Sequence, residues 1–116
     1  MLTITPESLA EEAIRKWHID PARMQKAVEI VTNRYQIYNQ HCPEGEYDVR
    51  SQHINGWYHV NTKSHTCTCP DSRRGYVCKH RLAVWIYVEI QKRTMEAIRQ
   101  DAKKYRQQPT ATAQPA

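Results

Sequence analysis

Hydrophobic residues recur at helical spacing through the first third of the chain. Residues 5–7, Thr-Pro-Glu, place a capping hydroxyl, a proline and an acidic side chain where the start of a helix favours them. A helix is therefore predicted from Pro6 to about Trp17. Asp20-Pro21 repeats this start signal, and the second helix that it predicts ends near Asn39. One side of the second helix is apolar, formed by Met24, Ala27, Val28, Val31, Tyr35 and Tyr38.

The hydrophobic period changes from helical to alternating after the Cys-Pro-Glu-Gly loop at residues 42–45. Residues 47–52 alternate between apolar and polar side chains, and residues 57–61 are rich in β-favouring types. Asn55-Gly56 between them is the strongest short hairpin signal. The pattern predicts a β-hairpin, either alone or joined by a third short strand at residues 65–69.

A long helix is predicted from Cys78 to Arg106. Residues 82–90 are apolar on nearly every side, and the helix becomes increasingly charged towards its end. Part of this apolar segment must pack as core between the N-terminal helices and the strands. Residues 107–116 consist mainly of Pro, Thr, Ala and Gln, so we expect a disordered tail.

Composition indicates that such a fold needs support besides its core. With 116 residues, no Phe and a mean hydropathy of −0.83, the chain can bury only a small apolar core. Residues 1–15 carry several acids and no long apolar run, so neither a signal peptide nor a membrane span is expected, and the cytosol is the expected compartment. In that reducing environment clustered cysteines favour metal over disulfides. The sequence also has no Gly-rich phosphate loop.

Three cysteines and one histidine follow the pattern C-x-C-x8-C-x-H, at Cys67, Cys69, Cys78 and His80. Residues two apart on a strand point to the same face, so the first two thiolates can reach one ion. Pro70 then ends the strand and Gly75 lets the loop turn back. The second pair comes from the start of the long helix, with the cysteine in its lead-in and the histidine in its first turn. Four such ligands complete a tetrahedral shell, which predicts one structural Zn²⁺ ion.

The chain contains another thiol and other imidazoles besides these four ligands. The alternative to a metal site is that the four residues are buried thiols beside a surface histidine. His65 precedes Cys67 by two residues and is a possible alternative ligand. Because four better-spaced ligands are available, we expect His65 at the surface or in contact with the ligands. Cys42 is expected to be a free thiol. The remaining histidines are expected to be ordinary surface or core residues: His18, His41, His53 and His59.

The residues around the metal ligands resemble the SWIM-type zinc finger. Residues 66–71 read Thr-Cys-Thr-Cys-Pro-Asp, and residues 77–83 read Val-Cys-Lys-His-Arg-Leu-Ala. The likeness covers about residues 46–88, and it departs from the family at Ser72-Arg73-Arg74, where members often carry an aromatic residue after the aspartate. The resemblance implies a ββα zinc module that binds DNA or proteins and is an accessory to chemistry performed elsewhere.

Together these features predict an α+β fold. Two N-terminal helices and a β-hairpin or three-stranded antiparallel sheet precede a long C-terminal helix that zinc anchors. We expect three segments: residues 1–45 as a helical segment packing on the finger, residues 46–106 as a SWIM-type finger with an extended C-terminal helix, and residues 107–116 as the tail.

The net charge of +5 lies in and after the cysteine cluster. Residues 1–46 carry five Lys or Arg against seven Asp or Glu, whereas residues 63–81 carry five against one and residues 91–106 six against two. This asymmetry favours a polyanionic partner, with nucleic acid (DNA) before membrane, although a merely solvated basic helix is the alternative. The candidate nucleic-acid-binding residues are Lys63, Arg73, Arg74, Lys79, Arg81, Lys92, Arg99, Lys103 and Arg106, with Tyr76 available for base stacking.

A protein partner is the second hypothesis. If residues 82–90 are apolar on more faces than one small domain covers, the surplus forms a surface for a homodimer or for a larger DNA-processing enzyme. An enzyme needs an open metal position or a nucleophile paired with a base, and the sequence indicates neither. The chain is therefore predicted to be a binding module, not an enzyme.

Overall fold

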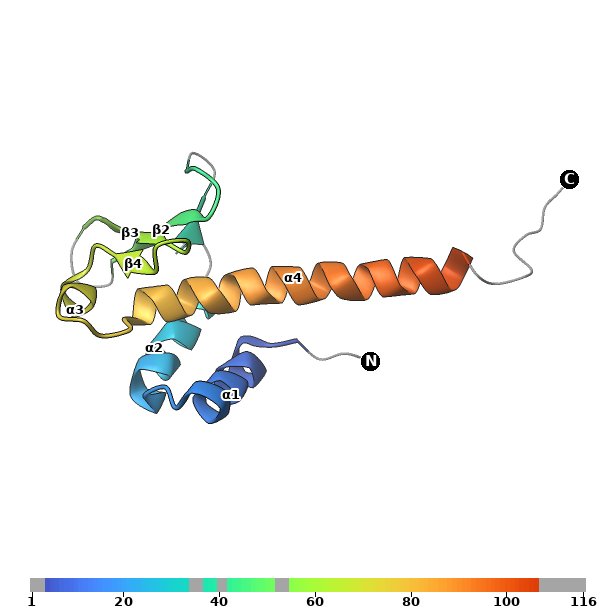
Figure 1. Ribbon diagram of the computed structural model, residues 1–116, viewed down its shortest axis with the longest axis horizontal. Coiled ribbons are helices and arrows are strands. Elements are labelled where there is room, and N and C mark those ends of the chain that lie inside the picture. Colours follow the sequence, from blue (N-terminus) through green and yellow to red (C-terminus); the bar gives the residue numbers. More distant parts are fainter. Residues whose placement is uncertain (1–3, 34–36, 40–41, 52–54, 107–116) are drawn as a thin grey trace, which may run out of the picture.

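A computed structural model describes residues 4–33, 37–39, 42–51 and 55–106, which form an α+β fold (Figure 1). This confirms the predicted fold class. The predicted disordered tail, residues 107–116, lies outside the described residues. The elements in chain order are α1 (Pro6–Trp17), α2 (Pro21–Thr32), β1 (Ile37–Tyr38), β2 (Glu46–Arg50), β3 (Trp57–Asn61), β4 (Thr66–Cys67), α3 (Pro70–Arg73) and α4 (Lys79–Arg106).

The first two helices begin where the sequence predicted. The backbone N–H of Ser8 donates to the side chain of Thr5 at 3.1 Å, and the backbone N–H of Thr5 donates to the side chain of Ser8 at 3.2 Å. These reciprocal bonds satisfy donors that a helix start leaves without intrahelical partners. At the start of α2, the Asp20 carboxylate accepts from the backbone N–H of Ala22 at 3.3 Å.

The second helix is shorter than predicted, so its expected end near Asn39 is wrong. Helix α2 ends at Thr32, and Asn33 after it has an extended backbone with φ −91° and ψ 109°. Ile37 and Tyr38 instead form β1, in which Ile37 pairs with Val49 of β2. Pairing with the sheet edge thus overrides the helical spacing of Tyr38, and Tyr35 lies outside the described residues.

The strands form one antiparallel sheet in the order β1-β2-β3-β4. Strands β2 and β3 make the predicted hairpin, with pairs running from Glu46 opposite Asn61 to Arg50 opposite Trp57. Strand β4 joins through Cys67 opposite Val60, which confirms the third strand, although it spans only two of the five predicted residues. Strand β1 is an additional edge strand that the sequence did not predict.

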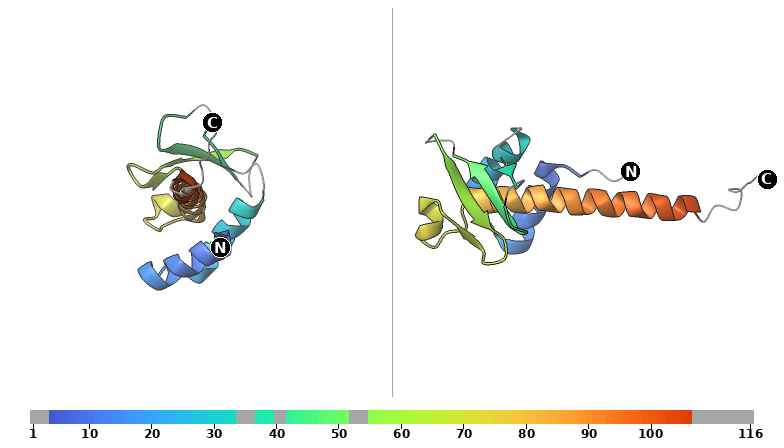
Figure 2. Two further views of the ribbon diagram at one scale, coloured as in Figure 1. Left: turned by 90° about the vertical axis from the view of Figure 1, so that its right-hand side faces the viewer. Right: turned by 90° about the horizontal axis from the view of Figure 1, so that it is seen from above.

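Helix α4 lies between the sheet and the α1–α2 pair, as the view along its axis shows (Figure 2). This position explains why residues 82–90 are apolar on nearly every side. One core cluster joins all three layers and includes Leu9, Ala13, Met24, Ala27, Ile30, Val49, Val60, Leu82, Ala83, Val84 and Ile86. The last turns of α4 extend beyond the sheet and α1 (Figure 1), and they leave Met95 and Ile98 exposed.

In the part of the chain that the structure describes, no helix has both the length and the apolar character needed to cross a membrane.

Candidate metal centre

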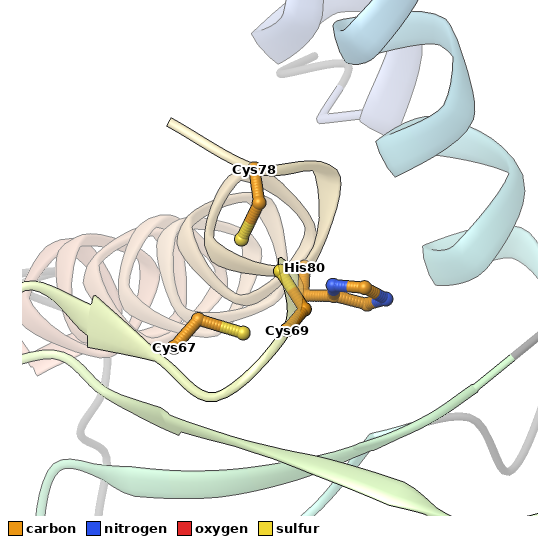
Figure 3. A group of neighbouring side chains, drawn as sticks. All are labelled: Cys67, Cys69, Cys78 and His80. Carbon is orange, nitrogen blue, oxygen red and sulfur yellow. The ribbon is translucent and has the colours of Figure 1, made fainter. Parts of the chain in front are cut away.

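The predicted metal ligands come from three consecutive elements (Figure 3). Cys67 is the last residue of β4, and Cys69 is the N-cap of α3 with an extended backbone, φ −75° and ψ 162°. Cys78 directly precedes α4, and His80 lies in its first turn. The predicted division between a lead-in cysteine and a helical histidine is therefore confirmed.

Their ligand atoms converge. One atom from each of the four side chains lies within 4.8 Å of all the others. The three thiols point toward one another, with the imidazole beside them (Figure 3). Zn–S bonds of about 2.3 Å in a tetrahedral shell place neighbouring sulfurs about 3.8 Å apart, so the cluster needs little contraction to enclose an ion.

The histidine itself indicates that a partner belongs here. His80 is 4% exposed, and neither of its buried ring nitrogens has a hydrogen-bond partner among the described residues. Buried polar atoms without a partner are rare because their desolvation is uncompensated. A metal ion would remove that cost for the nitrogen to which it binds. Three thiolates and an imidazole are ligands that zinc prefers, so the four residues form a site for one structural Zn²⁺.

The three thiols differ in pKa in the metal-free cluster. A hydrogen bond from Cys67 lowers the pKa of the Cys78 thiol to about 4. The same contact raises the pKa of Cys67, and burial raises the pKa of Cys69. One thiolate is thus favoured in the metal-free cluster, and zinc binding must displace the protons of the other two.

The local backbone holds the two ligand pairs together. The short helix α3, which the sequence did not predict, begins at Pro70, and Gly75 after it adopts φ +92°, a left-handed conformation that favours glycine. The backbone N–H of Arg81 donates to the Cys78 sulfur at 3.4 Å. The ring of Tyr58 on β3 packs on the His80 imidazole at a centroid distance of 4.8 Å. Sheet, loop and helix therefore meet at the site.

Competing side chains stay outside this cluster. His65 is exposed, with a left-handed backbone at φ 59°, and it is not among the clustered ligands. Cys42, expected to be a free thiol, is partly buried in the loop before β2.

The basic residues predicted to bind nucleic acid do not form one patch. Those around α3 and those along the outer part of α4 are exposed at opposite ends of the molecule (Figure 1), whereas Lys79 and Arg81 are partly buried. The Arg106 side chain lies outside the described part. Tyr76 is 52% exposed, but the Arg23 guanidinium covers its ring at 4.5 Å.

Three of these basic residues line one groove. Lys63 of the β3–β4 turn, Arg81 of the first turn of α4 and Lys92 further along that helix all border a cavity of about 750 Å³. Trp17 and Trp85 line the same cavity and meet edge to face at 5.2 Å. Trp17 is 53% exposed. We call this cavity the Trp groove. No sequence pattern indicates this groove, because its two tryptophans come from helices at opposite ends of the chain.

Comparison with known proteins agrees with the metal site. Residues 58–89 match the family model of the SWIM zinc finger. The matched span contains all four ligands, which confirms the predicted resemblance, although it begins in β3 and leaves β2 outside. The SWIM zinc finger is a binding module rather than a catalytic family. Neither curated proteins nor solved structures gave a match.

Proposed function

We propose that the protein binds single-stranded nucleic acid, with DNA as the first candidate, and that the bases lie against the Trp groove. The observation that supports this most is the combination of Lys63, Arg81 and Lys92 with two tryptophans around one cavity. Proteins that bind single strands without sequence preference pair a basic groove with aromatic rings, on which bases stack. The cations attract the phosphates, and the rings hold the bases.

The groove also contains two acidic residues, Glu44 and Glu89. The Glu89 carboxylate is already paired with basic side chains. Arg93 donates to it at 3.2 Å, and the Lys92 ammonium lies 4.0 Å away. This pairing limits its repulsion of a phosphate. Lys63 is exposed, and no ion pair joins it to an acid in the described part of the chain.

Zinc has a structural part in this proposal. Arg81 directly follows the ligand His80, so the ion fixes the start of the helix that carries both Arg81 and Lys92. The closed ligand shell leaves no position for a substrate, which argues for binding without catalysis. The cytosol suits this role, because thiols stay reduced there and remain available to the metal.

The remaining candidate residues add positive charge outside the groove. Arg99 and Lys103 continue along α4, and both are exposed, although Glu96 lies 3.8 Å from Arg99. Arg73 and Arg74 are exposed on and beside α3. In this proposal they attract the phosphate backbone at longer range and contribute mainly to the salt dependence of binding.

Fluorescence anisotropy with the zinc-loaded chain tests the proposal. A labelled single strand should bind more tightly than the matching duplex at low salt. Trp17→Ala should weaken single-strand binding by about 5- to 100-fold, the range expected for one stacked base. Trp57→Ala is the matched control, because Trp57 is 44% exposed but lies outside the groove. Undetectable binding at low salt, or equal losses in the two variants, would contradict the proposal.

A second candidate function is association with protein, including a second copy of the chain. Met95 and Ile98 are 51% and 57% exposed, three residues apart on the part of α4 that extends beyond the sheet. Neighbours at this spacing form an apolar strip of the kind that pairs with another helix. Sedimentation at high protein concentration tests self-association, and a purely monomeric protein would exclude it.

A further inference from the structure

A second group of side chains of metal-ligating types lies on the sheet face turned away from α4. Asp48 of β2 and His59 of β3 are directly opposite each other. Their neighbours Val49 and Val60 are buried in the core, and side chains alternate along a strand, so Asp48 and His59 project from the opposite face. Glu46, two residues before Asp48, shares that face.

Cys42 completes the group from the loop before β2. Its sulfur lies 3.8 Å from Oδ2 of Asp48, while Nδ1 of His59 lies 2.9 Å from Oδ1 of the same carboxylate. One ligand atom from each of these three residues lies within 4.8 Å of the other two.

We propose that Cys42, Asp48 and His59 bind a second Zn²⁺ ion, with Glu46 as a positioning residue. Sulfur, imidazole nitrogen and carboxylate oxygen are all zinc ligands, and three protein ligands leave one position for water. The site is separate from the Trp groove, so the inference does not rest on the proposed nucleic-acid binding.

The contact between Glu46 and His59 supports this assignment. Oε1 of Glu46 lies 2.7 Å from Nε2 of His59, and the other ring nitrogen faces Asp48. Histidines that bind metals through one nitrogen commonly donate the other N–H to a carboxylate, which fixes the tautomer and the ring orientation. Glu46 occupies that outer position and leaves Nδ1 to the metal.

The charges around the group also favour a cation. Two carboxylates and a thiol surround a single imidazole. Among the residues that the structure describes, neither Glu46 nor Asp48 forms an ion pair with Lys or Arg. A divalent ion would neutralise the carboxylates and fasten the loop at residues 42–45 to the hairpin. With one thiolate instead of three, this site should release zinc before the first one does.

Zinc stoichiometry of the full chain tests the inference. After saturation with Zn²⁺ and removal of excess metal, native mass spectrometry should show two ions per chain. Cys42→Ser and His59→Gln should each retain one, because the first site is intact. His65→Asn is the control and should retain two, since asparagine tolerates the left-handed backbone there. A single ion on the wild-type chain, or two ions on both variants, would overturn the inference.

Two further measurements cover the case in which a variant does not fold. In the wild-type chain, the second equivalent of Co²⁺ should add a thiolate-to-cobalt charge-transfer band, and a second equivalent without that band would contradict the site. Glu46→Gln should keep both ions but weaken the second by about 10- to 100-fold, as expected for a residue that orients a ligand. Unchanged affinity in that variant would remove Glu46 from the site.

Discussion

Arg93 of α4 binds Glu12 of α1 through two hydrogen bonds, with Nη1 2.9 Å from Oε2 and Nη2 3.1 Å from Oε1. The two residues are 81 positions apart in the sequence. Arg93 also donates to Glu89 one turn earlier on its own helix. This basic residue therefore fastens the N-terminal helices to α4 and belongs to the structure rather than to the candidate nucleic-acid surface.

The contact predicts a pH-dependent contribution to stability. Hydrogen bonding to Arg93 lowers the pKa of Glu12 from 4.5, so the contribution is fully present above about pH 4.5 and is lost as the pH falls through the lower, folded-state value. Glu12→Gln should lower Tm at pH 7, and the difference from wild type should shrink in acid. Glu11→Gln, an exposed neighbour, is the control for thermal melts followed by circular dichroism. A gap that persists unchanged down to pH 3 would argue against the contact.

Removing one ligand of the first zinc site should unfold much of the C-terminal half. Metal binding in small zinc domains contributes about 10 kcal/mol, which is comparable with the whole stability expected of a small domain. Cys78→Ser should therefore lose ordered structure by circular dichroism and amide-resolved NMR. Cys42→Ser removes one thiol outside this site and should keep the wild-type fold. Native spectra for Cys78→Ser would show that the metal is dispensable.

Tyr58 should influence zinc affinity without binding the ion. Its ring packs on the His80 imidazole at 4.8 Å, and aromatic contacts of this kind contribute about 0.5–1.5 kcal/mol. Tyr58→Ala should weaken zinc binding by up to about tenfold in a competition titration with a chelator, whereas Tyr58→Phe keeps the ring and should match wild type. Equal affinity in all three proteins would mean that the ring does not orient the ligand.

Salt dependence should separate the roles of the basic residues. Replacing Lys92, Arg99 and Lys103 together by Gln should reduce the slope of log K against log salt by about 2 for a single strand, if all three contact phosphates. A matched triple variant at Arg15, Lys26 and Arg50 removes the same charge from exposed positions elsewhere. If both variants change the slope equally, only net charge matters and these three residues of α4 have no specific role.

The sequence predicted those features that depend on residues close together in the chain. Capping at Thr5 and Asp20 marked the starts of two helices, and spacing alone identified the ligands from Cys67 to His80. Features that depend on distant partners were missed. Ile37 is a strand residue because Val49 lies beside it, and the Trp groove exists because the fold brings Trp17 to Trp85. The contact between Cys42 and Asp48 likewise appears only once the loop closes on the sheet.

Zinc X-ray absorption spectroscopy of the Cys42→Ser protein, loaded with one equivalent of zinc, identifies the atoms that bind the ion in the first site. The four-ligand site predicts a first shell of three sulfurs at about 2.3 Å and one nitrogen at about 2.0 Å. A shell dominated by oxygen and nitrogen, or one with fewer than three sulfurs, would contradict ligation by Cys67, Cys69, Cys78 and His80.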